Sequence, residues 1–437
     1  MSDKKKITKP APISGYPEWT PEVRLVEQQW FDHIRNVFES YGFCSLETPS
    51  VEDINVIAAK GEVDKEIYVL ERLHKEEEDD GDARLALHFD LTVPLARYVA
   101  QHFNDLVFPF KRYQMQRVWR GERPQAGRFR EFYQCDIDVI NVDHLPLHFD
   151  AEMPAVIWEV LKGLPGMENE NIQIRINNRK ILTGLCEAYD IKNITDVTRA
   201  IDKLEKIGEE NTKQELQQLG LTAKTADELL NIIQNKNLED IPVHLNDTVA
   251  DGYRELSYVK EFLSQVIPQD AFVIDLSIVR GLDYYTGTVY ETVFVDDPGY
   301  GSICSGGRYD DLASQYINKK LPGVGISIGF SRLFARLLDQ GKLPVSRKSP
   351  ADILMVLPNE EQRAIAAETA RKLRDRGFKV EMYHAPQKLK KQLAYAEKKG
   401  IPYVWFPPFE DGQDHEVKSM HSGEQKTDNP EDWSPDT

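Results

Sequence analysis

Two stretches of alternating residues decide the fold of the chain: Lys111-Arg112-Tyr113-Gln114-Met115-Gln116-Arg117-Val118-Trp119-Arg120-Gly121-Glu122-Arg123-Pro124 and Arg128-Phe129-Arg130-Glu131-Phe132-Tyr133-Gln134-Cys135-Asp136-Ile137-Asp138. Alternation with a period of two predicts a β-strand in each, because successive side chains of a strand point to opposite faces. A loop is predicted between them at Pro124-Gln125-Ala126-Gly127, so the strands are expected to form a hairpin. The polar residues expected on these strands are Arg120, Gln134 and Asp138.

A cation, a carboxylate and two phenols gather in a third stretch, Arg280-Gly281-Leu282-Asp283-Tyr284-Tyr285-Thr286-Gly287. The preceding residues, Phe272–Val279, form the apolar run of a buried strand, which puts Arg280 near a strand end. A buried arginine needs an anionic partner, because an unpaired buried charge is costly. Two interpretations stay open from this segment alone: a salt-bridged core arginine packed among tyrosines, or an arginine that faces a cleft.

Two further segments predict a strand followed by a helix. Gly323-Val324-Gly325-Ile326-Ser327-Ile328-Gly329 leads into Arg332 and the apolar-periodic run Leu333–Leu338. A glycine pattern of this kind is, by itself, weak evidence for a nucleotide site. Leu85–Pro94 predicts a strand and then a helix that begins at Thr92 or Pro94.

Length and cysteine content restrict the class of protein. The 437 residues suffice for about three domains with a large core. The cysteines are too scattered for a zinc site or a disulfide framework, which is typical of a reducing cytoplasm. His144 and His148 flank Pro146, which breaks the helix that a histidine pair would need. No metal site formed by a cage of protein ligands is therefore expected. The four cysteines are Cys44, Cys135, Cys186 and Cys304.

No targeting or membrane segment is expected. Pro10 and Pro12 follow Lys4–Lys6 where a signal peptide would need an apolar run. No apolar stretch approaches the roughly 20 residues needed to span a membrane. A cytoplasmic location without membrane contact is therefore expected.

Charge is unevenly distributed along the chain. The net charge of -18 argues against a nucleic-acid partner. However, Arg371–Lys399 contains ten Lys or Arg residues and three Asp or Glu residues. A local basic surface of this kind can neutralise phosphates whatever the total charge. The alternative interpretation is a helix with a solvated basic face.

The C-terminal part alternates between strand and helix patterns, which predicts a small, mainly parallel sheet. Helical periodicity predicts an inserted helical region from about Ile181 to Tyr258, and Gly341–Pro350 has the composition of a linker. Near the start, Asp32–Tyr41 has helical spacing and Phe43–Pro49 is extended. The C-terminal elements are, in order, Ile353–Leu357, Glu360–Arg376, Val380–Tyr383, Gln387–Lys399 and Tyr403–Phe406.

These segments together resemble the three signature regions of class II aminoacyl-tRNA synthetases. The Arg280 stretch, with Ser305-Gly306-Gly307-Arg308-Tyr309-Asp310, resembles the histidine-specific signatures of the histidyl-tRNA synthetase family, and the resemblance runs from Tyr16 to Gly423-Glu424-Gln425. It implies an α+β catalytic domain with a mainly antiparallel class II synthetase sheet over residues 1–340, with the helical insertion at about 181–258. After a linker over residues 341–350, it implies a small α/β anticodon-binding domain over residues 351–437. Because Asp32–Pro49 resembles the first class II signature, which forms a dimer interface in the family, a homodimer is expected.

The resemblance implies a ligase that acts in two steps. L-histidine and ATP, with Mg²⁺ expected, would give histidyl-adenylate and pyrophosphate, and the histidine would then pass to the 3' end of tRNA(His). Such a reaction needs no enzyme nucleophile, and arginines that position and neutralise the phosphates supply the acceleration. The resemblance assigns this role to Arg120 and Arg280, which would hold the α-phosphate and the reacting carboxylate.

Site residues also follow from the resemblance. The ring nitrogens of histidine would contact Asp138 and Tyr285, since a neutral imidazole offers one donor and one acceptor. The α-amino group would contact Asp90, Thr92 and Gln134. The full histidine set is Asp90, Leu91, Thr92, Arg120, Gln134, Asp138, Arg280, Tyr284, Tyr285 and Tyr309, with Tyr284 and Tyr309 as walls. The ATP set is Arg120, Glu122, Phe132 and Arg332, where Glu122 would contact adenine or a metal ion and Phe132 would stack on the base or pack in the core.

Two positions depart from the family pattern. Ser331 stands where the third class II signature usually has an acidic residue, and Asp138 stands where glutamate is common. Two other functions compete with catalysis: a histidine-binding regulator that partners ATP phosphoribosyltransferase, and a tRNA-sensing module without turnover. Such regulators typically lack the ATP-site arginines and the C-terminal domain. The presence of Arg120, Arg280 and Arg332 therefore favours the enzyme.

Overall fold

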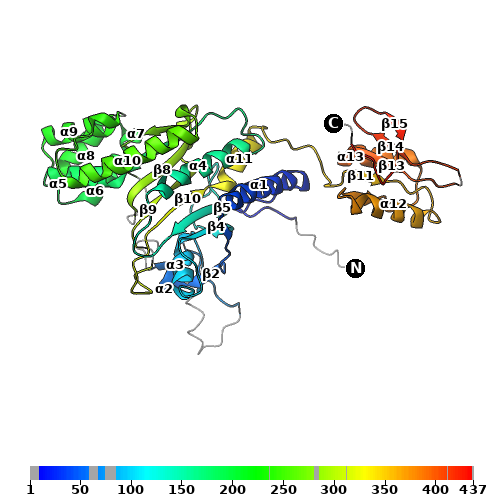
Figure 1. Cartoon of the computed structure of the whole chain (residues 1–437), viewed down its shortest axis with the longest axis horizontal. Helices are drawn as coiled ribbons and strands as arrows, with labels where there is room; N and C mark the ends of the chain where they lie inside the picture. Colours follow the sequence, from blue (N-terminus) through cyan, green and yellow to red (C-terminus); the bar gives the residue numbers. More distant parts are fainter. Residues whose placement is uncertain are drawn as a thin grey trace, which may run out of the picture. The chain divides into compact units, whose positions relative to one another are not determined.

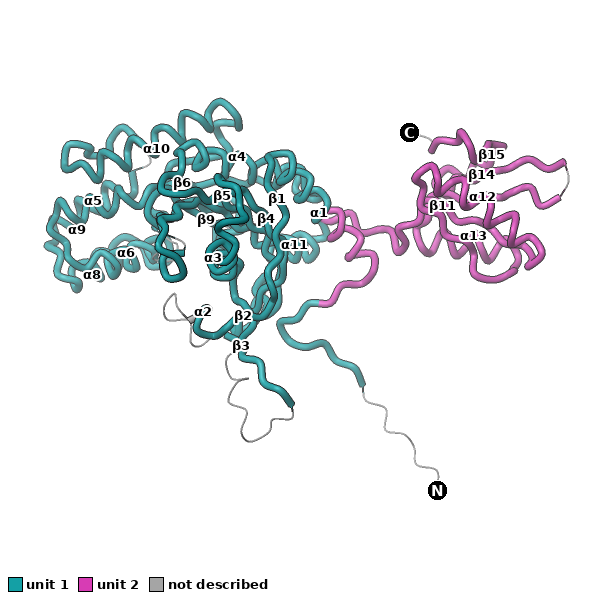
Figure 2. The backbone as a smooth tube through the Cα atoms, turned by 60° about the horizontal axis from the view of Figure 1, so that its bottom comes forward, with its two compact units in different colours: residues 1–17, 31–342 teal, residues 18–30, 343–437 magenta. Residues whose placement is uncertain are grey.

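The computed structural model describes residues 9–58, 67–73, 85–235, 237–279, 285–311, 313–410 and 412–435. The chain forms two compact units (Figure 2). The first contains residues 1–17 and 31–342, and the second contains residues 18–30 and 343–437. Two of the expected site residues, Arg280 and Tyr284, lie outside the described residues, as do Lys4–Lys6.

An eight-stranded sheet is the centre of the first unit, in the order β1-β4-β5-β10-β9-β8-β6-β7 (Figure 1). The strands from β4 to β6 pair antiparallel, whereas β1 and β7 pair parallel at the two edges. The prediction of a mainly antiparallel sheet is therefore confirmed. The strands are β1 (Cys44–Ser45), β4 (Phe110–Trp119), β5 (Glu131–Ile140), β6 (Ile172–Asn178), β7 (Phe272–Ile274), β8 (Tyr285–Phe294), β9 (Cys304–Tyr309) and β10 (Gly323–Ile328).

The predicted hairpin is present as β4 and β5, but two strand ends differ from the prediction. Arg120 lies one residue beyond β4, where its backbone N–H donates to the Arg130 carbonyl at 2.9 Å. The strand expected over Phe272–Val279 ends at Ile274, because the carboxylate of Asp275 accepts hydrogen bonds from the backbone and hydroxyl of Ser277 and turns the chain.

Helices and a small two-stranded ladder complete this part of the first unit. In α11, Phe330, Leu333, Phe334 and Leu337 are buried at the spacing of one helix face. Phe330 also stacks on Phe31 of α1, with ring centroids 4.2 Å apart. The helices are α1 (Pro21–Ser40), α2 (Ile54–Ala58), α3 (Thr92–Gln101), α4 (His148–Gly163) and α11 (Phe330–Asp339); the ladder is β2 (Val51–Asp53) with β3 (Leu85–Leu87); the short 3₁₀ turns are η3 (Gln269–Ala271) and η4 (Pro298–Tyr300).

A group of helices fills the chain between β6 and β7 and lies together at one end of the first unit (Figure 1). Several begin at a side-chain cap. The side chains of Asn193, Thr222 and Asn246 each accept a hydrogen bond from a backbone N–H in the first turn, which satisfies a donor that the helix itself cannot. The group is α5 (Arg179–Ala188), α6 (Ile194–Asp202), α7 (Leu204–Ile207), α8 (Glu209–Gln218), α9 (Ala223–Gln234), η2 (Leu238–Asp240) and α10 (Asp247–Val266).

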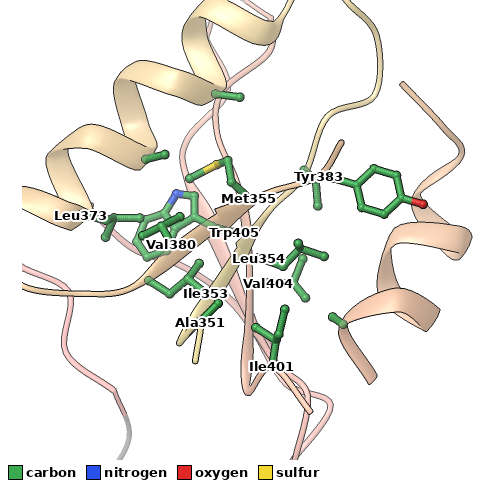
Figure 3. Close-up of a cluster of buried hydrophobic side chains, with 14 of the residues drawn as sticks. Ala351, Ile353, Leu354, Met355, Leu373, Val380, Tyr383, Ile401, Val404 and Trp405 are labelled. Carbon is green, nitrogen blue, oxygen red and sulfur yellow. The ribbon is translucent and has the colours of Figure 1, made fainter. Parts of the chain in front are cut away.

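The second unit contains a five-stranded sheet in the order β12-β11-β13-β14-β15. The three predicted strands pair parallel, and two short antiparallel strands that were not predicted extend the sheet beyond β13. Its core surrounds β11 and Trp405 (Figure 3). The elements are β11 (Ile353–Met355), α12 (Arg363–Asp375), β12 (Val380–Met382), α13 (Leu389–Lys399), β13 (Tyr403–Phe406), β14 (Glu416–Ser419) and β15 (Gln425–Thr427).

Candidate active site

Two adjoining cavities open over the large sheet. The first cavity has a volume of about 290 Å³ and the second about 310 Å³, sizes suited to small ligands. Five of the described residues line both cavities, so the cavities form one site with two compartments. The shared residues are Arg120, Gln134, Ser302, Ser305 and Ser327.

A row of polar side chains crosses the sheet beneath the first cavity. We call it the polar row, and its members lie opposite one another in the register of β4, β5, β10, β9 and β8. Because opposite residues of paired strands share a face, the polar row presents several polar groups to one side of the sheet. Its members are Gln114, Asp136, Ser327, Ser305 and Glu291, of which Gln114, Asp136 and Glu291 are buried.

Asp138 lies at the next position of β5 on this face and has two strong partners. The guanidinium of Arg112, opposite Asp138 in the register, forms an ion pair with its Oδ2 at 2.6 Å. The hydroxyl of Tyr309 donates a hydrogen bond to its Oδ1 at 2.9 Å. All three side chains are buried. The carboxylate is therefore held in one orientation at the wall of the first cavity, which Tyr285 also lines.

Glycines make room for these side chains. A Cβ atom at Gly325 would lie 2.1 Å from Asp138 Oδ1, and one at Gly323 would lie 2.3 Å from the ring of Tyr309. Both distances are far below van der Waals contact. The glycine pattern of β10 is thus required by the bulk of its neighbours.

The opposite end of the first cavity contains the residues expected at the α-amino group. Gln134 donates from Nε2 to Ser327 Oγ at 2.7 Å, which leaves its buried Oε1 without a hydrogen-bond partner in the described part of the chain. Asp90 Oδ1 accepts from the Val93 backbone N–H at 3.0 Å, so this carboxylate also caps α3. Thr92 lines the cavity, whereas the side chain of Leu91 is fully buried and does not.

Arg120 stands at the junction of the two cavities. Its Nε donates to the Phe89 carbonyl at 3.0 Å, and its guanidinium lies 5.2 Å from the centre of the Phe132 ring. Glu122 Oε1 lies 4.0 Å from Arg120 Nη1, and Glu122 Oε2 lies 3.6 Å from Arg128 Nη1. These contacts hold the guanidinium in place, and Arg120 lines both compartments.

Arg332 forms the far wall of the second cavity. Its guanidinium lies 4.7 Å from the centre of the Tyr300 ring, and it donates to the Tyr300 carbonyl while the Tyr300 hydroxyl donates to the Arg332 carbonyl at 2.8 Å. Ser331, at the departure from the class II pattern, is buried, and its Oγ accepts from the Tyr133 backbone N–H at 2.8 Å. Its hydroxyl thus joins α11 to β5.

Asp136 is a carboxyl group of the site whose pKa is strongly raised. Burial raises its pKa to about 7, although the charge of Arg112 and a hydrogen bond from Ser327 lower it. The negative charges of Asp138 and Asp90 raise it further. The protonation change of this carboxyl group therefore lies close to neutral pH.

The structure gathers most of the expected site residues around the two cavities. Phe132 lies at the second cavity, where a base can stack on it. The first cavity is lined by Asp90, Thr92, Arg120, Gln134, Asp138, Tyr285 and Tyr309, and the second by Arg120, Glu122, Phe132 and Arg332.

Several residues of the site were not predicted. Arg112 and Asp136 share the alternation that identified Gln134 and Asp138, so their spacing was a usable signal. The sequence around Glu291 and Ser302 contained no signal of this kind, because only the strand register and the path of the loop bring these residues to the cavities. Arg308, part of a histidine-specific signature, lies on the other face of β9 and binds the carboxylate of Asp150 on α4.

Two features are absent from the residues that the structure describes. Within them, no group of three or more His, Cys, Asp or Glu side chains is arranged to hold a metal ion. None of the helices found there combines the length and apolar character needed to cross a membrane.

Comparison with known proteins identifies the family. The family model described as "Histidyl-tRNA synthetase" matches residues 15–333, and one described as "Anticodon binding domain" matches residues 343–432. The histidine–tRNA ligase of Thermobifida fusca (strain YX) is 55% identical over 437 residues, which cover 98% of this chain and 99% of that protein. The crystal structure of histidyl-tRNA synthetase from Nostoc sp. PCC 7120 is 39% identical, with a TM-score of 0.86 over 96% of this chain and 97% of that one.

A more distant structure shares the fold alone. It is an ATP phosphoribosyltransferase regulatory subunit/histidyl-tRNA synthetase from Bacillus halodurans C, 21% identical, with a TM-score of 0.71 over 86% of this chain and 93% of that one. The first family model covers the whole site described above, including both strands of the hairpin and the start of α11. The chain belongs to the histidyl-tRNA synthetase family.

Proposed function

We propose that the chain is a histidine–tRNA ligase whose two cavities receive the two substrates of its first step. L-histidine occupies the first cavity and ATP occupies the second. The observation that carries this proposal is that Arg120 lines both compartments, next to buried polar groups on one side and an aromatic ring on the other. A reaction between a carboxylate and a phosphate needs a cation at that junction.

The first step forms histidyl-adenylate. A carboxylate oxygen of histidine attacks the α-phosphorus of ATP, the bond from that phosphorus to the bridging oxygen breaks, and pyrophosphate leaves. Arg120 holds both anions in line and offsets the charge that develops on the phosphate. Arg280, outside the described residues, has the same assigned role. In the second step a ribose hydroxyl at the 3' end of tRNA(His) attacks the adenylate carbonyl and AMP leaves.

Histidine is selected by its polar groups. Asp138 and Tyr285 contact the two ring nitrogens, and Asp90, Thr92 and Gln134 contact the α-amino group. Support comes from the ion pair of Asp138 with Arg112, which keeps a charged acceptor facing the ring. A cavity of this kind rejects an analogue without ring nitrogens, since its buried polar groups would then be unpaired.

ATP is bound by stacking and by cations. Phe132 and Arg332 enclose the adenine ring or the outer phosphates, and Glu122 is the one acidic residue among the described residues that line the second cavity. Mg²⁺ is usually held by one or two carboxylates together with substrate phosphates, a donor set that Glu122 and ATP supply. We assign Glu122 to that ion. When bound, Mg²⁺ neutralises phosphate charge.

The second unit binds tRNA in this proposal. Several cations of Arg371–Lys399 already have protein partners: Arg376 donates to the carbonyls of Pro430 and Trp433, and Lys399 pairs with Glu381 at 2.8 Å. Lys388, Lys390 and Lys391, at the start of α13, are exposed and form no ion pair with any described residue. These three lysines are the best candidates for phosphate contacts.

Two further assignments complete the proposal. We infer a homodimer through the segment that resembles the first class II signature, now seen as α1 and β1, and a cytoplasmic location. Sedimentation equilibrium of the purified chain tests the dimer. A mass near 50.2 kDa at micromolar concentration would contradict it.

One assay separates the enzyme from both alternatives. Exchange of labelled pyrophosphate into ATP that depends on histidine requires the complete first step, and we expect it from the purified chain without tRNA. A regulator would bind histidine without exchange. A tRNA-sensing module would bind tRNA without exchange, so folded protein that shows no exchange would reject the proposed activity.

A further inference from the structure

We propose that Asp136 is a positioning residue that orients Gln134 toward the α-ammonium group of histidine through the hydroxyl of Ser327, and that histidine binding releases the proton of Asp136. The inference rests on the proposed function, because it assigns the ammonium group of histidine to this end of the first cavity. It adds Asp136 to the residues that position histidine, and it adds the release of the Asp136 proton when histidine binds.

A chain of three side chains carries the effect. Asp136 and Ser327 lie opposite each other in the β5–β10 register, on the same face of the sheet, and the Ser327 side chain lowers the pKa of the Asp136 carboxyl group. The same oxygen of Ser327 accepts from Gln134 Nε2 at 2.7 Å. An amide whose NH₂ is bound in this way presents its carbonyl oxygen on the other side. Gln134 Oε1 is buried at the site and has no donor among the described residues. The ammonium group of histidine supplies one.

Two unsatisfied acceptors indicate that Asp136 carries a proton while the cavity is empty. Asp136 Oδ1 and Gln114 Oε1 are both buried, and neither has a hydrogen-bond donor within the described chain. The two residues lie opposite each other in the β4–β5 register. The amide orientation of Gln114 is fixed, because its Nε2 donates to Thr48 Oγ1 at 3.0 Å and to Gln116 Oε1 at 2.7 Å. One proton on Asp136 would serve both orphaned oxygens, whereas an ionised Asp136 would leave both without a donor.

The charges around Asp136 determine when it loses that proton. Arg112 on β4 favours the ionised form, and Asp138 on β5 and Asp90 before α3 oppose it. Ser327 on β10 also favours the ionised form, and Gln114 on β4 is neutral. Burial dominates and raises the pKa to about 7. An ammonium group in the first cavity is a new positive charge nearby, which lowers the pKa and expels the proton to solvent.

The sign of the pH dependence follows. A ligand that lowers the pKa of a group on the protein binds more tightly above that pKa, where no proton has to be displaced. The advantage is lost as the pH falls through about 7. A fall of one unit in the pKa on binding corresponds to about a tenfold gain in affinity.

The test is calorimetric titration of the full chain with L-histidine at pH 5.5, 7 and 8, in pairs of buffers with different ionisation enthalpies. We expect the unaltered chain to release a fraction of a proton at pH 7 that Asp136→Asn does not release. The affinity of Asp136→Asn should fall by about tenfold at pH 8 and match the unaltered chain at pH 5.5. Asp352→Asn, the same chemical change in the second unit, should leave both measurements unchanged.

A second ligand excludes a general structural effect. 3-(Imidazol-4-yl)propionate is histidine without its α-amino group, so Asp136→Asn should not alter its affinity at any pH. If Asp136→Asn does not fold, Ser327→Ala interrupts the same chain and should weaken histidine while sparing this analogue.

The possible outcomes distinguish a failure of the role proposed for Asp136 from a failure of the proposed function. Equal pH profiles for the unaltered chain and Asp136→Asn, with tight histidine binding in both, would overturn the role of Asp136 and leave the proposed function intact. Equal loss of both ligands would also overturn it, because it would indicate a damaged cavity. An unaltered chain that does not bind histidine would reject the proposed function itself.

Discussion

The two sheets of the molecule bury polar groups in different ways. In the second unit, Gln392 is fully buried, and both ends of its amide are satisfied: the Leu357 N–H donates to its Oε1 at 2.9 Å, and its Nε2 donates to the Leu357 and Gln387 carbonyls at 2.9 and 2.7 Å. In the first unit, the described residues give Gln134 a partner at its Nε2 only. The amide of Gln392 is thus fully used by the fold, whereas the amide oxygen of Gln134 is available to a ligand in the first cavity.

The strands show the same contrast. Ile353, Leu354 and Met355 of β11 are all fully buried, because apolar residues cover both faces of this sheet (Figure 3). In β5, Gln134, Asp136 and Asp138 are buried on one face beside apolar residues on the other. Unsatisfied buried polar groups each cost about 1–3 kcal/mol. Among the described residues, the first sheet thus gives up stability at the candidate site, whereas the second has no such groups along β11.

The largest expected effect is on the stability of the second unit. Trp405→Ala removes a fully buried side chain, and we expect a loss of about 3–5 kcal/mol in the free energy of unfolding of that unit. Chemical denaturation followed by circular dichroism measures it. Histidine-dependent pyrophosphate exchange should persist under conditions where both units are folded, because both cavities are lined by residues of the first unit. Loss of exchange under conditions where both units are folded would contradict the assignment of the exchange reaction to the first unit.

Arg120→Ala tests the junction of the cavities. We expect the exchange rate to fall by about 10²–10³-fold, since the charge acts on the phosphate in the transition state. Thermal unfolding should change little, because the guanidinium is one-third exposed and its contacts are few. Arg117→Ala, near the end of the preceding strand β4 and about half exposed, is the matched control. A rate within threefold of the unaltered chain would remove Arg120 from the reaction.

Two glutamine substitutions, one in each unit, test the contrast between the two sheets. Gln392→Leu leaves three backbone groups unpaired and should cost about 1–3 kcal/mol in the free energy of unfolding. Gln134→Leu removes a half-satisfied amide, so stability should change by less than about 1 kcal/mol while histidine affinity falls. Denaturation and calorimetry of both variants measure these quantities. If Gln134→Leu is the more destabilised of the two, the contrast between the sheets is wrong.

The smallest effect is expected at the basic surface of the second unit. Replacing Lys388, Lys390 and Lys391 by Ala should weaken tRNA binding and lower the magnitude of its salt slope by about 2–3, because each lost phosphate contact removes 0.7–0.9 from it. Filter binding at several salt concentrations measures both. Histidine-dependent exchange without tRNA is the internal control and should be unchanged. An unaltered slope would place the phosphate contacts elsewhere.

Features that depend on residues close together in the sequence could be predicted, whereas features that depend on pairing between distant segments could not. Alternation within β4 and β5 is local, so the hairpin, Gln134 and Asp138 could be predicted. The antiparallel strands β14 and β15 were missed because they are short and polar, and pairing with β13 rather than their own pattern makes them strands.

The site was harder to predict than the fold. The polar row exists only when five strands, far apart in the sequence, align in one register, so Glu291 gives no local signal. Asp136 could be found from its spacing, but its pKa depends on burial and on Arg112 across the hairpin. The glycine pattern that includes Gly325 was only weak evidence for a nucleotide site, and the structure shows that a side chain at Gly325 would collide with Asp138.

The most direct test of the central claim is a crystal structure of the chain with a sulfamoyl analogue of histidyl-adenylate. The account predicts an imidazole ring between Asp138 and Tyr285, an α-amino group at Gln134 Oε1, the sulfamoyl group at Arg120 and the adenine at Phe132. Density for the analogue outside the two cavities, or with the imidazole in the second cavity, would contradict the account.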